Sequence, residues 1–162
     1  MTPDHAEEAV AEILDNVVPT HGYRLAPMVG LGGSAGAIGA LQQFFRNIPP
    51  DSGQAFVVVL HLAPEHESSL PAILQQCTTM PVVQVRDRQR VEPNHVYVIP
   101  PGKALRATDG HLALSTDALS PRGRHVAVDL FFRTLADIYG PHSAAVVPVS
   151  YTHLTLPTIL LV

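Results

Sequence analysis

The stretch VGLGGSAGAIGALQQFF, residues 29–45, decides the fold of this chain. Its first residues continue an apolar run that starts at Leu25 and ends in glycines, which is typical of a buried parallel strand. The residues after Ser34 have the spacing of an amphipathic helix, which Pro49 and Pro50 would end. The apolar positions of that helix are Ile38, Leu41, Phe44, Phe45 and Ile48. A strand that turns directly into such a helix predicts the first unit of an α/β domain.

The same alternation of apolar strands and amphipathic helices continues along the chain. Further strands are expected over residues 55–60, 81–85, 95–102 and 143–147, and helices over residues 67–77 and 126–139. Residues 104–115 differ, because two short stretches flank Asp109-Gly110, a pair typical of a type I′ β-hairpin. The pattern predicts a doubly wound, mostly parallel sheet in a Rossmann-like, three-layer arrangement, with a β-hairpin excursion.

The bulk composition limits the classes of protein to consider. The 162 residues suffice for one domain, and 46% of them are hydrophobic, which indicates a globular fold. A net charge of -4 gives no basic surface for nucleic acid. Cys77 is the single cysteine, so neither an internal disulfide nor a cysteine-based zinc site is expected. The acidic N-terminus and the lack of a run of about 18 apolar residues predict a cytoplasmic protein without membrane insertion.

The motif Gly32-Gly33-Ser34-Ala35-Gly36 carries the sharpest chemical signal. It has the form G-x-S-x-G and lies between a predicted strand and a predicted helix, where small neighbours let the chain turn tightly and expose the serine hydroxyl. The first turn of a helix also leaves backbone N–H groups free. We therefore interpret Ser34 as a nucleophile and the N–H of Ala35 as a donor to a developing oxyanion.

A serine nucleophile needs a base, and His61 follows the second predicted strand. Sequential strands of a doubly wound sheet are often neighbours, and ligands of such sheets bind beyond the carboxyl ends of the strands. Both Ser34 and His61 fall at such ends. The topology therefore predicts that the two side chains meet.

The same glycines allow a second interpretation. The pattern Gly30-x-Gly32-x-x-Ala35 fits a loose dinucleotide fingerprint. That fold needs an acidic residue at the end of the second strand, where this chain has His61, and Asp51 precedes that strand instead of ending it. A dinucleotide-binding Rossmann domain is therefore kept as an alternative.

Other reactive side chains have structural explanations. A metal site of His61, Glu65 and His66 would lack the helical register of H-E-x-x-H, because Pro64 interrupts it. Cys77 is expected to be a small buried residue of its helix. Of the acids Asp87 and Asp129, the second lies near a predicted helix N-terminus, where a carboxylate interacts favourably with the helix dipole. No metal and no cofactor are expected.

Four stretches of the chain together resemble one family. They are VGLGGSAGAIGALQQFF, AFVVVLHLAPEHESSLPAILQQCTTMPV, VEPNHVYVIPPGKAL and AVDLFFRTLADIYG, which occur in this order between residues 27 and 147. They resemble the chemotaxis protein-glutamate methylesterases of the CheB type, and most closely the domain at the front of CheB/CheR methylesterase–methyltransferase fusion proteins. The strand end VLH-x-x-P and the strand VYVIPPG make this resemblance more specific than the pentapeptide.

The resemblance implies a carboxylic ester hydrolase of bacterial chemotaxis signal transduction. It implies that a catalytic triad in the order Ser, His, Asp hydrolyses glutamate methyl esters on methyl-accepting chemotaxis receptors, and that it also deamidates receptor glutamines. Ser34 would be the nucleophile and His61 its base. The implied partners are the cytoplasmic helices of these receptors, with a methyltransferase domain as a further partner in the parent chain.

Two positions near Ser34 depart from the family pattern. Ala37 stands where the family usually has a second glycine, and Gly39 stands where an acidic residue is common. These departures motivate a second hypothesis, a non-catalytic module of the same fold that binds receptors or a methyltransferase.

The end of the chain departs further. The family continues after the strand matching 144–147 into a Gly-rich loop with the catalytic Asp, whereas PVSYTHLTLPT in this chain resembles the translation of a sequencing adapter. We therefore expect an N-terminal leader over 1–24, a methylesterase domain over 25–147 that lacks its C-terminal part, and a non-native tail over 148–162. The third triad Asp is expected to be absent and the fragment inactive.

Overall fold

The computed structural model describes residues 25–61, 69–116, 126–150 and 155–161. The first half contains the strands β1 (Met28–Ser34), β2 (Ala55–His61), β3 (Val82–Gln84), β4 (Gln89–Arg90) and β5 (Val96–Val98), with the 3₁₀ helix η2 (Ala35–Ala37) and the helices α2 (Ile38–Asn47) and α4 (Leu70–Gln75). The second half contains β6 (Ala104–Thr108), β7 (His111–Ser115), α5 (Val126–Tyr139), the 3₁₀ helix η3 (Gly140–His142), β8 (Ser143–Ser150) and β9 (Thr155–Leu161).

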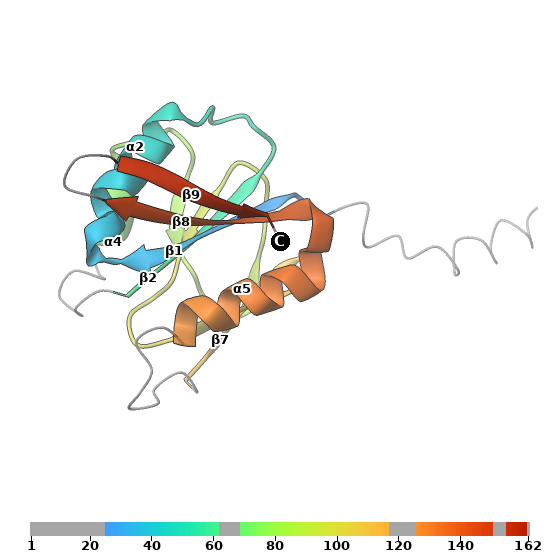
Figure 1. Cartoon of the computed structure of the whole chain (residues 1–162). Coiled ribbons are helices and arrows are strands. Elements are labelled where there is room, and N and C mark those ends of the chain that lie inside the picture. The colour runs from blue at the N-terminus through green and yellow to red at the C-terminus, as the bar shows by residue number, and fades with distance from the viewer. Residues whose placement is uncertain (1–24, 62–68, 117–125, 151–154, 162) are drawn as a thin grey trace, which may run out of the picture.

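The main sheet has six strands in the order β3-β5-β2-β1-β8-β9. Every neighbouring pair is parallel except β8 and β9, which are antiparallel (Figure 1). The chain winds outward from β1 to β2 and returns to place β8 on the other side of β1. The strand order therefore reverses between β1 and β8, and such switch points are where doubly wound sheets bind ligands.

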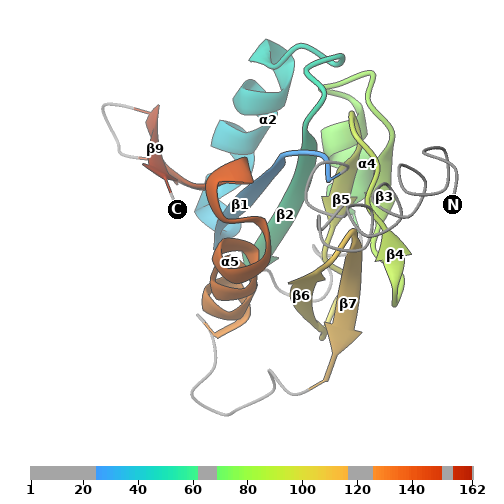
Figure 2. The same ribbon diagram turned by 90° about the vertical axis from the view of Figure 1, so that its right-hand side faces the viewer.

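Helices cover both faces of this sheet and form three layers (Figures 1 and 2). The helices α2 and α4 pack on one face through a cluster that includes Leu41, Phe45 and Leu74. Helix α5 packs on the other face, together with the small sheet, through a cluster that includes Phe131 and Leu135. The predicted fold class, a mostly parallel three-layer α/β arrangement, is confirmed.

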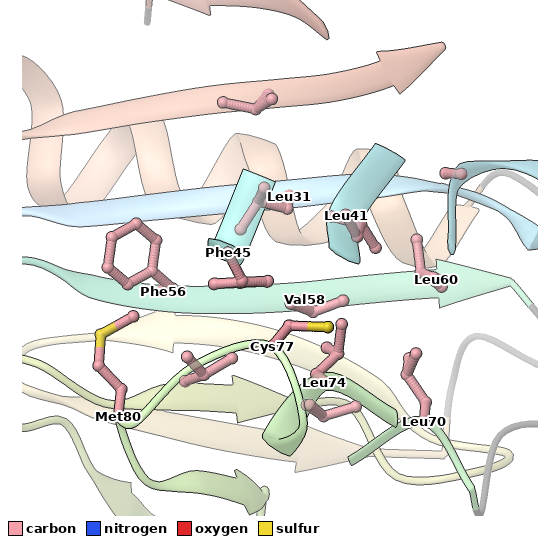
Figure 3. Packing of buried hydrophobic residues seen from close by; sticks show 14 residues of the cluster. Leu31, Leu41, Phe45, Phe56, Val58, Leu60, Leu70, Leu74, Cys77 and Met80 are labelled. Carbon is pink, nitrogen blue, oxygen red and sulfur yellow. The ribbon is translucent and has the colours of Figure 1, made fainter. Parts of the chain in front are cut away.

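The cluster beneath α2 and α4 is closely packed (Figure 3). The rings of Phe45 and Phe56 meet edge to face with centroids 5.7 Å apart, and Phe44 makes similar contacts with both. Such edge-to-face pairs add to the stabilisation that burial of the rings provides. This cluster fixes α2, and with it the turn that precedes α2, against β1 and β2.

The β-hairpin excursion belongs to a second, three-stranded antiparallel sheet in the order β4-β7-β6. Thr108 pairs with His111 across a two-residue turn, as the Asp109-Gly110 pair predicts. The turn is not type I′, because that type needs a positive φ at both central residues and only Gly110, at φ 71°, has one. An aspartate pays a steric cost in the left-handed region, and here only the glycine adopts it.

Most predicted elements are present with shifted ends. Helix α5 has the predicted bounds, whereas β3 and β5 are shorter than the strands expected over 81–85 and 95–102. Strand β8 runs to Ser150 and pairs with β9, beyond the boundary predicted after residue 147. The division of the chain into leader, domain and tail stays a prediction, and the leader of residues 1–24 lies outside the described residues.

Candidate functional site

Ser34 and His61 are the last residues of neighbouring parallel strands, and they are partners in the register of β1 and β2. Neighbouring strands lie about 4.8 Å apart, so a serine hydroxyl and an imidazole at paired positions are within reach of each other. Both residues are exposed at the carboxyl end of the sheet. Neither side chain has a hydrogen-bond or ion-pair partner within the described ranges. The structure therefore brings the two predicted residues together.

The alternation of the strands assigns both side chains to the same face of the sheet. In β2, Val57 and Val59 pack into the cluster with α5, whereas Val58 and Leu60 pack into the cluster with α2 and α4. Successive side chains of a strand point to opposite faces, so His61 shares the α5 face. In β1, Gly32 contacts α5, which places Ser34 on that face as well.

Helix α5 runs antiparallel to β1, with its N-terminal turn toward the Ser34 end. A Cβ atom built on Gly32 would lie 2.5 Å from Cγ1 of Val128, in the first turn of α5. A Cβ atom built on Gly30 would lie 3.0 Å from both Phe131 and Leu135, further along the helix. The positive end of the helix dipole is thus directed toward the end of the sheet that carries Ser34 and His61.

These contacts give Gly30 and Gly32 a role different from phosphate binding. Their missing side chains leave room for α5 to lie directly on β1, because a Cβ atom at Gly32 would collide with the helix and one at Gly30 would be tightly crowded by it. In a dinucleotide-binding turn, glycines leave room for a pyrophosphate. The fingerprint-like spacing of this chain therefore has its explanation in helix packing.

The turn after Ser34 is compact because Gly33 has no side chain. A Cβ atom at Gly33 would lie 3.2 Å from Cβ of Ala37, which is 3% exposed. The backbone of Ser34 is extended (φ -105°), and the chain then enters η2 over Ala35–Ala37. The residues of a first helical turn have N–H groups without intrahelical acceptors, so the N–H of Ala35 is available beside Ser34.

The two departures from the family pattern are accommodated in different ways. The methyl group of Ala37 is part of the core cluster and contacts the Gly33 position. Gly39 is exposed, and a side chain there would meet nothing within 4 Å. Neither residue disturbs the turn that carries Ser34.

The remaining candidates have structural environments, where the structure describes them. Cys77 is buried as predicted, but α4 ends at Gln75, so Cys77 lies just beyond the helix instead of within it. Asp129 is exposed in the first turn of α5, as predicted. Asp87 accepts a hydrogen bond from the backbone N–H of Leu114 at 3.0 Å. Glu65 and His66 lie outside the described residues.

No three side chains of His, Cys, Asp or Glu within the described ranges gather in a way that would hold a metal ion. None of the described helices is both long and apolar enough to cross a membrane.

A hollow that the sequence did not reveal lies at the opposite end of the sheet. It has a volume of about 670 Å³ and is lined in part by Arg90, Glu92 and His95. Charged residues alternate with apolar ones in this stretch, but a solvated loop has the same pattern. Only the fold shows that these three residues line one hollow.

This chain is similar to several known proteins. A protein of Albidiferax ferrireducens named protein-glutamate methylesterase/protein-glutamine glutaminase 1 is 25% identical over 122 residues, which cover 74% of this chain and 32% of that protein. A protein of the same name from Xanthomonas euvesicatoria is 30% identical over 123 residues, which cover 74% of this chain and 34% of that protein. The chain thus spans about a third of the length of these relatives.

A solved structure and a family model extend the comparison. The crystal structure of the Thermotoga maritima CheB methylesterase catalytic domain superposes with a TM-score of 0.68 and 26% identity, covering 78% of this chain and 68% of that one. Residues 29–149 match the model of the family described as CheB methylesterase, and this range includes β1, β2 and both strand-end residues. The chain belongs to the CheB methylesterase family.

Proposed function

We propose that this chain carries the nucleophile and the base of a protein-glutamate methylesterase, a carboxylic ester hydrolase. The observation that supports this most is the register pairing of Ser34 with His61 at the carboxyl ends of β1 and β2. The names of the relatives suggest the substrate, a methyl ester of a glutamate side chain in a protein, and a second activity on glutamine. We further propose that the substrate lies in the cytoplasmic helices of a methyl-accepting chemotaxis receptor.

In the proposed first step, Oγ of Ser34 attacks the ester carbonyl carbon while His61 accepts the hydroxyl proton. The carbonyl oxygen becomes an oxyanion, which accepts a hydrogen bond from the N–H of Ala35. The tetrahedral intermediate then collapses, the bond to the methoxy group breaks, and His61 returns the proton to the leaving methanol. A glutamyl ester of Ser34 remains.

In the second step, His61 takes a proton from a water molecule that attacks the same carbonyl carbon. The bond to Oγ breaks, Ser34 recovers its proton, and a free glutamate carboxylate leaves. An amide substrate follows the same path and releases ammonia instead of methanol. The positive end of α5 favours the negative charge that develops in both steps.

Trapping of the acyl intermediate tests the assignment on this chain. The chain is incubated with an activated aryl ester of an N-acetyl, C-amidated glutamate, and the adduct is located by peptide mass spectrometry. An activated ester is chosen because its acylation depends on the nucleophile and base alone. We expect one glutamyl adduct on Ser34 and none in Ser34→Ala.

Ser115→Ala is the matched control, because Ser115 ends β7 as Ser34 ends β1. It should retain the adduct. An adduct on any other residue, or an adduct that survives in Ser34→Ala, would overturn the assignment.

A further inference from the structure

The hollow that includes Arg90 lies at the end of the sheet opposite to Ser34 and His61. Its lining residues Ala26, Gly53 and His95 lie one or two positions before β1, β2 and β5. Strand β1 has seven residues, which span about 20 Å at the usual rise of a strand. A ligand in this hollow would therefore not contact the candidate catalytic pair.

Hydrogen bonds hold the loop of residues 90–95, which forms much of this hollow, at several points. Asn94 has a left-handed backbone (φ 60°), its side-chain Oδ1 accepts from the N–H of Gly53 at 2.7 Å, and its own N–H donates to the Gln54 carbonyl at 2.8 Å. The Glu92 N–H donates to the hydroxyl of Tyr97 at 2.8 Å. The loop is thus shaped before any ligand arrives, which reduces the entropy that a ligand must overcome.

The charged side chains of the hollow differ in their partners. The carboxylate of Glu92 lies 3.5 Å from Nε2 of His95, and Nδ1 of His95 lies 2.8 Å from the Pro93 carbonyl oxygen. Within the described ranges, the guanidinium of Arg90 has no carboxylate partner. The Glu92 carboxylate lies beside His95, and the Arg90 guanidinium is available to an external carboxylate.

We propose that this hollow binds a carboxylate side chain on an acidic segment of a partner protein. A guanidinium presents paired N–H donors that match a carboxylate. The hollow is open to solvent, and small-molecule sites usually enclose most of their ligand, so a side chain presented on a larger surface fits better. The apolar residues Leu25 and Val91 in its lining can contact the methylene groups of an acidic side chain.

The test is a titration of the full chain with hexaglutamate, acetylated and amidated at its ends, followed by backbone NMR shifts. We expect saturable changes in the backbone chemical shifts of residues 90–95 with hexaglutamate and no such changes with hexaglutamine. Arg90→Gln should weaken the binding about tenfold or more, as expected for loss of a charge-assisted hydrogen bond. Arg90→Lys should retain part of it, because the charge stays while the planar fork is lost.

Arg133→Gln is the matched control, because Arg133 is an exposed arginine on α5 and lies outside the hollow. Equal weakening in this variant, or shifts spread over the whole surface, would show nonspecific attraction and overturn the proposal. No shift at millimolar hexaglutamate would also overturn it. Inorganic phosphate that binds the same residues more strongly than hexaglutamate would overturn the proposal in favour of a phosphate ligand. Acetate that binds as strongly as hexaglutamate would overturn it in favour of a small-molecule site.

The proposal is independent of the catalytic assignment. Arg90→Gln should leave the acylation of Ser34 unchanged, and Ser34→Ala should leave the hexaglutamate titration unchanged. Melting curves of both variants check that the fold is intact. A loss of both properties in Arg90→Gln with a normal melting curve would contradict the separation of the two ends.

Discussion

The two ends of the parallel strands differ in how their polar groups are partnered. At the carboxyl end, Ser34 and His61 are exposed, and within the described ranges their side chains have no polar partner. At the amino end, the loop of residues 90–95 is held by hydrogen bonds to Gly53, Gln54 and Tyr97. The contrast suggests that rigid strands position groups for chemistry at one end, while side-chain and backbone bonds maintain the shape of the other.

The largest effect is expected from removal of the base at the carboxyl end. In His61→Ala the rate of acylation of Ser34 by the activated ester should fall by about 10²–10⁴-fold, because a positioned base contributes that much. The measurement is the initial rate of adduct formation by intact mass. His111→Ala removes an exposed imidazole from β7 and should leave the rate unchanged. An unchanged rate in His61→Ala would remove His61 from the proposed mechanism.

The next effect concerns the contact of α5 with β1 just before Ser34. Gly32→Ala should lower the free energy of unfolding by roughly 1–3 kcal/mol, because its Cβ atom would lie 2.5 Å from Val128 and force α5 to move. Gly36→Ala is the matched control, because a Cβ atom there meets nothing within 4 Å. Urea denaturation measures both. Equal free energies of unfolding of the two variants would show that the packing of α5 on β1 does not require a glycine at position 32.

The sequence predicted the strand-end pair because both signals were local. An apolar run ending in glycines, followed by a helical period, located Ser34, and β-branched residues before His61 located the second strand. Their pairing then followed from the usual adjacency of sequential strands. The structure confirms this adjacency in the register of β1 and β2.

Long-range contacts were beyond the reach of the sequence. Gly30 and Gly32 contact α5, about 100 residues later in the chain, whereas local spacing left a dinucleotide-binding turn open as an alternative. The hollow at the amino end likewise needs residues before three different strands to meet. The predicted type I′ turn was wrong for a different reason, because Asp109-Gly110 is compatible with more than one turn type.

At the amino end, substitutions of Asn94 separate the two features that hold the loop. Asn94→Gly keeps the left-handed backbone and removes the acceptor for the Gly53 N–H, which should cost about 1 kcal/mol of unfolding free energy. Asn94→Ala removes the acceptor and also strains the backbone, which should cost about 1 kcal/mol more. Urea denaturation gives both values. Acylation of Ser34 should be unchanged in the two variants, and a slower reaction would show that the ends are coupled.

The smallest effect is expected at Tyr139, whose hydroxyl is buried beside the backbone of Gly110 but makes no hydrogen bond of good geometry within the described structure. Burial raises the pKa of Tyr139 to about 12, the backbone of Gly110 opposes part of this rise, and the nearby Asp109 and Tyr97 side chains add smaller increases. An unfolded tyrosine titrates near pH 10, so the folded state binds this proton more tightly. Stability linked to Tyr139 is therefore fully present below pH 10 and is lost as the pH rises from 10 through about 12.

Tyr139→Phe removes this titration and leaves no buried donor unsatisfied. Its unfolding free energy at pH 7 should lie within about 1 kcal/mol of the parent value, since the hydroxyl makes no bond that the variant would lose. Between pH 10 and 12 the decline in stability should be shallower than in the parent chain. Tyr97→Phe provides the contrast, because the Tyr97 hydroxyl accepts from Glu92 and donates to the Arg90 carbonyl, and its loss should already destabilise the loop at pH 7. A large drop in the unfolding free energy of Tyr139→Phe at pH 7 would contradict this expectation. It would mean that the Tyr139 hydroxyl makes a stabilising hydrogen bond in solution.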